Sequence, residues 1–279
     1  MPLFVVATPV GNLEDITRRA VRVLGEVELV LAEDTRATRV LLDAIGASTP
    51  MRSYHDHSDA RVVSAIVERL KAGAHIGLVS DAGTPCVSDP GYELVRAAID
   101  AGVPVVPIPG ASSVLAFVSA AGLPTDRFQF VGFAPRKDGA RTEACAAWAG
   151  YPGTTVVLES PNRIVDLLSR LAELAPERDV VVGRELTKLH EEFVRGSAVA
   201  VLAELGSRDR VRGEVVLGIG PAPAIAAADV EVDAWTAELV GLGLRTKDVA
   251  RVVARRLGRS VDEVYRRALE LREGRGGED

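Results

Sequence analysis

The chain has 279 residues, of which 47% are hydrophobic, 33 are basic and 39 are acidic, giving a formal net charge of −6. This length suits two domains better than one core, and the hydrophobic share is typical of packed globular proteins. An acidic total excludes a protein coated evenly in positive charge, but it is compatible with a local basic patch. The cysteines Cys86 and Cys145 show neither a disulfide framework nor metal-ligand spacing, which favours a reduced, cytoplasmic setting.

The first apolar run, residues 1–7, lacks the basic region of a signal peptide and predicts a strand. Apolar runs of strand length recur up to about residue 220, and they lie at residues 3–7, 28–32, 75–79, 103–107, 128–133, 154–158, 179–183 and 214–219. Segments with helical spacing separate most of these runs. The alternation predicts an α/β fold with mostly parallel sheets that are covered by helices on both faces.

We expect two α/β/α domains, at residues 1–123 and 124–222, followed by a small helical domain at 231–273. The Pro- and Ala-rich stretch 221–228 reads as a linker. Beyond it only helical patterns occur, ended by Gly243 and Gly258. No run approaches the length of a membrane span.

The most informative loop, residues 80–91, follows the apolar strand 75–79. Its glycines permit close approach of a ligand, and its prolines stiffen it. Asp81 and Thr84 offer hydrogen bonds to a ligand, whereas Asp89 reads as a helix N-cap with Pro90 at the first helical position. A turn-rich connection without function is the alternative interpretation.

Further polar loops follow the other predicted strands, at residues 8–12, 33–36, 109–113, 159–163 and 184–192. In open α/β sheets such loops meet at the carboxyl ends of the strands, where ligands bind. The chain lacks a phosphate loop ending in Gly-Lys-Ser/Thr, a G-x-S-x-G elbow and a paired-cysteine metal site. We therefore expect one cleft, acidic and hydroxyl-rich on one side and basic on the other, without a metal.

These loops carry motifs that resemble the tetrapyrrole methylase-like family. They read TPVGNLEDITRRA at 8–20, AEDTR at 32–36, SDAGTP at 80–85, ESPNRI at 159–164 and RELTKLHEEF at 184–193. The later motifs are similar to the small-subunit ribosomal RNA methyltransferase I branch, which methylates a cytidine 2′-hydroxyl in the decoding region. The likeness covers about residues 3–220. It implies S-adenosylmethionine (SAM) bound between two α/β domains, and commonly a homodimer.

The resemblance also implies the cofactor-binding residues, which are Pro9, Asp81, Thr84, Ser112, Ser113, Leu158 and Arg184. The chain departs from the family pattern at two positions. Cys86 stands where glycine is expected, which adds bulk to the cofactor loop, and Asn162 stands where histidine is expected.

The catalytic candidates are Glu159, Arg163, Glu185, Lys188 and His190. Methyl transfer from a sulfonium depends mostly on alignment, although a base would help a ribose hydroxyl. Glu33, Asp34, Glu159, Glu185 and His190 are possible bases. Each has a structural alternative, such as ion pairs of Asp34 with Arg36 and of Glu159 with Arg163. The basic members could instead hold phosphates, and we expect Arg163→Ala to reduce methylation without abolishing cofactor binding.

The predicted C-terminal helices are basic, since residues 245–275 contain ten Lys or Arg and five Asp or Glu. Arg251, Arg255 and Arg259 share one helix face. They predict contact with ribosomal RNA or the small ribosomal subunit, or else a solvated face on a bundle that supports a dimer. Two other functions stay open: methylation of a small tetrapyrrole or corrinoid precursor, and RNA or nucleotide binding without catalysis.

Overall fold

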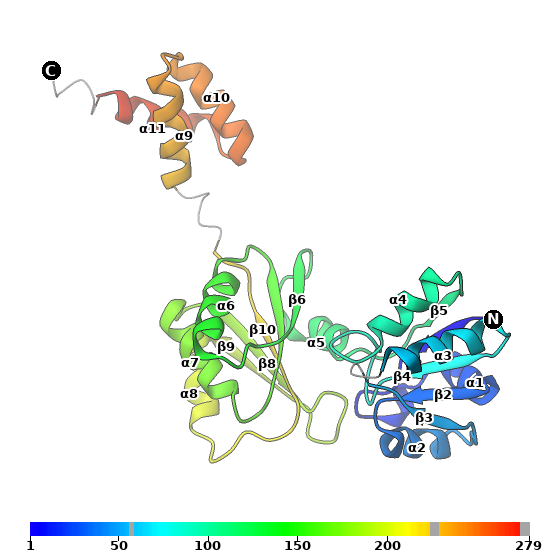
Figure 1. The fold of residues 1–279 in the computed structure, drawn as a ribbon. Helices are drawn as coiled ribbons and strands as arrows, with labels where there is room; N and C mark the ends of the chain where they lie inside the picture. The colour runs from blue at the N-terminus through cyan, green and yellow to red at the C-terminus, as the bar shows by residue number, and fades with distance from the viewer. Residues whose placement is uncertain (56–58, 224–228, 274–279) are drawn as a thin grey trace. The chain divides into compact units, whose positions relative to one another are not determined.

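The computed structural model describes residues 1–55, 59–223 and 229–273 (Figure 1). The chain divides into two compact units, Met1–Pro221 and Ala222–Asp279. Among the described residues, no helix combines the length and apolarity needed to cross a bilayer.

The first sheet is fully parallel, with the strand order β3-β2-β4-β1-β5. Its strands are β1 (Leu3–Val6), β2 (Leu29–Ala32), β3 (Met51–Ser53), β4 (Ile76–Val79) and β5 (Val105–Ile108). Both β2 and β4 are buried along their whole length, as expected for strands covered on both faces.

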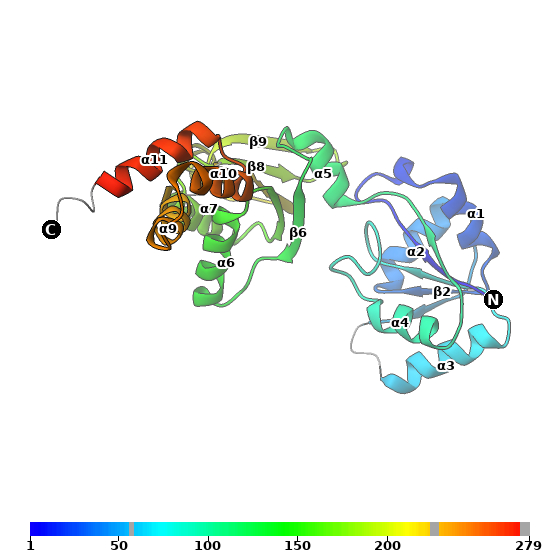
Figure 2. The ribbon, with the colours of Figure 1, turned by 90° about the horizontal axis from the view of Figure 1, so that it is seen from above.

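Alternating side chains of this sheet serve two separate cores. Leu29 and Leu31 pack with α3 (Ala60–Lys71) and α4 (Tyr92–Asp100), whereas Val30 packs with α1 (Arg18–Glu26) and α2 (Thr35–Ala44). Figure 2 shows the two helix pairs on opposite sides of β2. This is the doubly covered α/β layer that the alternating pattern predicts.

The second sheet is mixed, with the order β6-β7-β10-β8-β9. Its strands are β6 (Phe128–Phe133), β7 (Thr154–Glu159), β8 (Asp179–Arg184), β9 (Glu192–Ser197) and β10 (Val215–Ile219). Only β6 and β7 pair in parallel; the remaining neighbours are antiparallel. Parallel pairings still predominate over the two sheets together, as predicted. The segments β9 and α8 (Ala198–Gly206) are absent from the sequence prediction.

Helices cover both faces of the second sheet. One face packs against α6 (Asp138–Gly150), α7 (Ile164–Leu174) and α8. The other face packs against α5 (Ser113–Ala121), which follows the last strand of the first sheet. The ring of Phe117 lies on Gly183 and Gly218, where an added Cβ would come within 2.7 Å of it. Helix α5, which precedes the predicted domain boundary at residue 123, thus packs on the second sheet. This packing does not test the boundary, which stays a prediction.

The predicted helix cap at Asp89 is wrong, and α7 likewise begins later than the proline in its motif suggests. The N-cap of α4 is Gly91, at φ 136° and without a side-chain cap bond, so Asp89 does not cap this helix. The N-cap of α7 is Arg163, and neither Ser160 nor Pro161 belongs to the helix. In both places the loop continues past the proline before the helix begins.

The second unit holds three helices within its described residues, α9 (Asp229–Gly241), α10 (Thr246–Leu257) and α11 (Val261–Glu273), as the sequence predicts. They share a small core of their own, which includes Val249, Val253 and Val264. Arg267 of α11 binds both carboxylate oxygens of Asp233 on α9, at 2.5 and 2.6 Å. Most of the predicted linker, residues 224–228, lies outside the described residues.

Candidate active site

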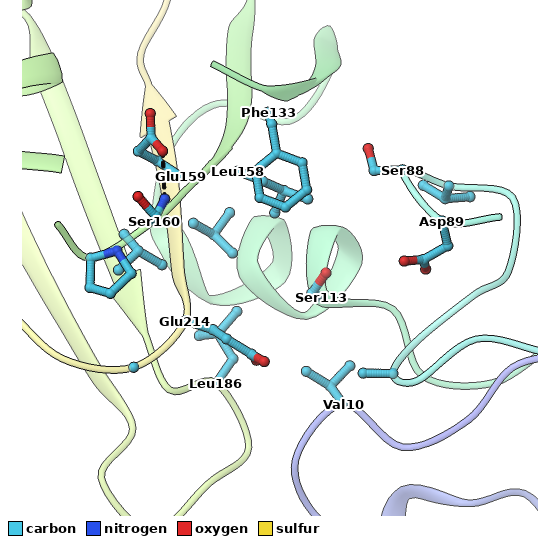
Figure 3. Close-up of a pocket in the computed structure, with 16 residues that line it drawn as sticks. Val10, Ser88, Asp89, Ser113, Phe133, Leu158, Glu159, Ser160, Leu186 and Glu214 are labelled. Carbon is cyan, nitrogen blue, oxygen red and sulfur yellow. Dashed lines mark hydrogen bonds between the residues drawn. The ribbon is translucent and has the colours of Figure 1, made fainter. Parts of the chain in front are cut away.

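A cavity of about 360 Å³ lies within the unit Met1–Pro221 (Figure 3). Its walls come from the loops after β1 and β4, the start of α5, the ends of β6 and β7, and the chain around β8 and β10. The lining residues are Val10, Ala82, Val87, Ser88, Asp89, Ser113, Phe133, Leu158, Glu159, Ser160, Pro161, Leu186, Gly213, Glu214, Val215 and Val216. Most of the wall is apolar, and Asp89, Glu159 and Glu214 are acidic.

The strand register explains why distant segments meet here. Phe133 pairs with Leu158, and Glu159 and Arg184 both pair with Val215. Because β10 runs antiparallel to β7 and β8, its first residue lies beside their last residues. The carboxyl ends of β6, β7 and β8 and the amino end of β10 therefore form one edge of the sheet. Five of the six loops that the sequence predicts to converge supply lining residues here, and the loop at 33–36 supplies none.

The loops of the first sheet are fastened to one another by hydrogen bonds. Thr8 and Gly83 form an isolated antiparallel bridge, and the Thr8 hydroxyl also donates to the carbonyl of Ser80 at 3.2 Å. Asp81 accepts a bond from the backbone N–H of Asp34 at 2.9 Å. Thr84 donates to the carbonyl of Ala111 at 3.1 Å. Asp81 and Thr84 thus tie loops together and do not line the cavity.

The wall formed by residues 82–89 has a strained backbone. Cys86 and Ser88 adopt φ angles of 69° and 63°, in the left-handed region that residues other than glycine rarely enter. Glycine enters this region without steric cost, which explains why glycine is the residue expected at position 86. The left-handed turn at Ser88 immediately precedes Asp89, and both residues line the cavity.

The other predicted cofactor residues have different positions. Ser113 and Leu158 line the cavity, and Pro9 lies next to the lining residue Val10. Ser112 caps α5 through a bond from the N–H of Leu115 at 3.4 Å and lines a neighbouring groove instead. Arg184 also stays outside the lining, because its side chain binds Glu192 at 3.0 Å.

Glu159 and Arg163 form an ion pair at 2.5 Å beside the cavity wall. The Glu159 side chain is fully buried, and its Oε1 also accepts the Ser160 N–H at 2.6 Å. Oε2 of Glu159 has no hydrogen-bond partner within the described structure. Arg163 further donates to the Ser160 hydroxyl at 3.2 Å. The pair therefore fixes the turn at Ser160, in agreement with its structural interpretation.

Glu185 and Lys188 fasten the opposite wall. Lys188 binds Glu185 at 3.0 Å and the lining residue Glu214 at 3.1 Å. Glu185 and Glu214 also exchange hydrogen bonds, because each backbone N–H donates to the other residue. The bond from the Glu214 N–H, followed by that from Lys188, lowers the pKa of Glu185. A lowered pKa makes this carboxylate a weaker base.

Two further base candidates lie away from the cavity. His190 is exposed and does not line it. Asp34 binds Arg36 at 2.6 Å, and hydrogen bonds from Arg36 lower the pKa of Asp34 to about 2. The lining residues Phe133, Leu186 and Glu214 were not predicted as site residues. Strand pairing brings Phe133 and Glu214 to the cavity, and no local motif marks these two, whereas Leu186 belongs to the motif at 184–193.

Glu192 holds two arginines at the same edge of the sheet. Arg208 and Arg184 bind it at 2.8 and 3.0 Å. Hydrogen bonds from Arg208, and secondarily from Arg184, lower the pKa of Glu192 from 4.5 to about 2. A carboxylate whose pKa is depressed by folding stabilises the protein above its unfolded pKa, and this stabilisation disappears as pH falls towards the folded pKa.

We therefore expect part of the unfolding free energy to be lost between pH 4.5 and about 2 through Glu192. Because this side chain is 32% exposed, solvent screening limits the contribution to on the order of 1 kcal/mol. Urea denaturation between pH 2 and 6 measures it. Glu192→Gln should flatten this part of the profile, whereas Glu26→Gln, in an exposed pair with Arg22, should leave it unchanged.

No cluster of three or more metal-ligating side chains occurs in the described parts of the chain. The fold and the cavity together define a protein with two α/β layers and a cavity at the strand ends. The chain belongs to the family of Tetrapyrrole (Corrin/Porphyrin) Methylases, whose model matches residues 2–201.

Curated relatives cover almost the whole chain. "Ribosomal RNA small subunit methyltransferase I" of Mesorhizobium japonicum is 41% identical over 99% of this chain and 94% of its own length. The protein of the same name from Pasteurella multocida is 41% identical over 96% of both chains.

Among solved structures, uroporphyrin-III C-methyl transferase from Thermus thermophilus, complexed with S-adenyl homocysteine, is 26% identical with a TM-score of 0.57. The match covers 79% of this chain and 97% of that one. Cobalt precorrin-4 methyltransferase gives a TM-score of 0.59 over 78% of this chain and 94% of its own, at 17% identity, and shares the fold alone.

Proposed function

We propose that the protein transfers a methyl group from SAM to the 2′-hydroxyl of a cytidine in the decoding region of small-subunit ribosomal RNA. The observation that carries this proposal is the 41% identity to relatives named for that RNA subunit, over nearly the entire chain. We further propose that the protein acts in the cytoplasm, where this RNA is found, and as a homodimer.

The cavity suits a cofactor of this kind. Its volume of about 360 Å³ lies within the range of small-molecule sites. Apolar side chains such as Leu158, Leu186 and Val216 offer surface to an adenine ring. Asp89 and Glu214 offer negative charge to the ammonium and the sulfonium, and Ser113 offers a hydroxyl. When bound there, the cofactor supplies an electrophilic methyl group.

The predicted catalytic residues then act mainly by positioning. The Glu159–Arg163 pair holds the Ser160–Pro161 turn, and the Glu185–Lys188 pair holds Glu214. The Ser160–Pro161 turn and Glu214 both line the cavity, so the two ion pairs fix the space that an acceptor hydroxyl enters. Fixed alignment accounts for much of the acceleration of an in-line displacement.

Methylation of a small tetrapyrrole is the second candidate, because the family and the 26% identical structure include that activity. One assay separates the candidates: purified protein and labelled SAM are offered small ribosomal subunits, naked 16S RNA or a corrinoid precursor. We expect label in RNA and, after nuclease digestion, in a 2′-O-methylcytidine. Label in the corrinoid alone would contradict the proposal, and cofactor binding without any transfer would indicate a binding module.

We propose that the helical unit also contacts RNA. Arg251 and Arg255 on α10 are exposed and form no ion pair within the described residues, whereas Arg259 binds Glu263 at 3.2 Å. If they contact phosphates, Arg251→Ala/Arg255→Ala should lower the slope of log affinity against log salt by about 0.7 for each contact with single-stranded RNA. Filter binding across a KCl series measures the slope. An unchanged slope would favour the solvated face of a supporting bundle.

A further inference from the structure

Cations without carboxylate partners gather at the edge of the second sheet that holds the cavity. Arg136 and Lys137 follow the end of β6, and Arg210 and Arg212 precede β10. All four side chains are exposed, and within the described parts of the chain none of them forms an ion pair. The register places the end of β6 and the start of β10 at this same edge, on either side of β7.

The other cations of this edge are already neutralised. Arg163 pairs with Glu159, Lys188 with Glu185, and both Arg184 and Arg208 with Glu192. The four unpaired cations therefore form a local excess of positive charge on a chain whose net charge is −6. Such an excess favours a ligand with several negative charges.

The cofactor does not explain this excess. SAM carries a sulfonium and an ammonium against one carboxylate, and the charged lining residues of the cavity are acidic. Unpaired cations beside the cavity would repel such a ligand. They fit the phosphates of a second ligand that reaches the cavity from the same edge.

An exposed aromatic ring lines the cavity at the end of β6, three residues before Arg136. Phe133, the last residue of β6, is 59% exposed and lines the cavity. The register of β6 shifts between Phe130 and Phe133, with Gly132 at φ 70°, and such an irregularity redirects the side chain that follows it. In Figure 3 the ring extends from β6 toward Ser113 at the start of α5.

A ring with an open face beside free cations is the arrangement that binds an unpaired nucleotide, because bases stack on aromatic rings and cations hold the phosphates. We propose that Phe133 is the stacking platform for the target nucleobase, and that Arg136, Lys137, Arg210 and Arg212 hold the flanking phosphates. This inference rests on the proposed function and deepens it. It assigns recognition of the nucleotide to the ends of β6 and β10.

The test uses the full-length protein and a fluorescent single-stranded RNA with the decoding-region sequence. Phe133→Leu removes the ring and keeps apolar bulk, whereas Phe133→Tyr keeps the ring. We expect Phe133→Leu to weaken RNA binding about tenfold and Phe133→Tyr to change it less than about twofold. Affinity for S-adenosylhomocysteine, measured by calorimetry, should be unchanged in both. Since the ring is mostly exposed, both variants should melt like the wild type.

The cations are tested by the salt dependence of the same binding reaction. Arg210→Ala/Arg212→Ala should lower the slope of log affinity against log KCl by about 0.7 for each lost phosphate contact. Arg22→Ala/Arg96→Ala, which removes two exposed and paired arginines from α1 and α4, should leave the slope unchanged.

Three results would overturn the inference, and they have different meanings. Loss of S-adenosylhomocysteine affinity in Phe133→Leu with unchanged RNA affinity would place the cofactor adenine on the ring. Wild-type RNA methylation with no effect of any variant would overturn the nucleotide platform and leave the proposed function standing. A wild-type protein that binds S-adenosylhomocysteine and no RNA would overturn both.

Discussion

Replacing Arg163 with methionine is expected to lower the free energy of unfolding by about 3 kcal/mol, as measured by urea denaturation. Its partner Glu159 has a side chain with no exposed surface, so the substitution leaves a buried carboxylate without its cation. Burying an uncompensated charge is strongly unfavourable, whereas removing both charges is much less so. The double variant Glu159→Gln/Arg163→Met should therefore recover most of the loss.

The matched control is Arg22→Met, which removes an arginine from a pair whose two side chains are both 60% exposed. Exposed pairs contribute little, so this change should be below about 0.5 kcal/mol. Equal losses in the two variants would show that the burial of Glu159 does not matter. Because Arg163 does not line the cavity, calorimetry on folded Arg163→Met should find nearly normal cofactor affinity. The rate of methyl transfer should decrease, because the Ser160–Pro161 turn loses its hydrogen bond from Arg163.

Replacing Phe117 with alanine is expected to lower the free energy of unfolding by about 4 kcal/mol. The ring is fully buried, lies on Gly183 and Gly218, and stacks with Phe193 at a centroid distance of 6.0 Å. It packs α5 on the second sheet together with Val114, Val118 and Ala121. Since α5 begins at the lining residue Ser113, cofactor affinity should fall together with stability.

Leu115→Ala is the control for this prediction, because Leu115 lies on the same helix and is 60% exposed. It should change stability by less than about 0.5 kcal/mol. Gly183→Ala supplies the reverse test, since its Cβ would come within 2.7 Å of the Phe117 ring and no closer than 3.2 Å to Leu186, the next side chain. We expect it to destabilise the wild type and to be tolerated better alongside Phe117→Leu. Equal effects in both backgrounds would contradict the packing.

The sequence predicts which loops line the cavity better than it predicts the lining residues within them. The loop after β4 does reach the cavity, but it does so through Ala82, Val87, Ser88 and Asp89. Asp81 and Thr84, the polar residues that the motif suggests, bond to neighbouring loops. A motif does not distinguish a polar side chain that contacts a ligand from one that holds a loop in place. The left-handed turns at Cys86 and Ser88, which only the structure shows, determine which residues of this loop face the cavity.

By itself, the sequence determined the α/β class, the elements of the first sheet and the three C-terminal helices, because local hydrophobic periodicity specifies all of these. Motifs of several residues were enough to indicate the family. Tertiary structure decided the rest: the antiparallel insertion of β10 between β7 and β8, the packing of α5 on the second sheet, and the position of Phe133 at the cavity. These features depend on pairing between segments far apart in the chain, and local periodicity contains no information about which distant strands become neighbours.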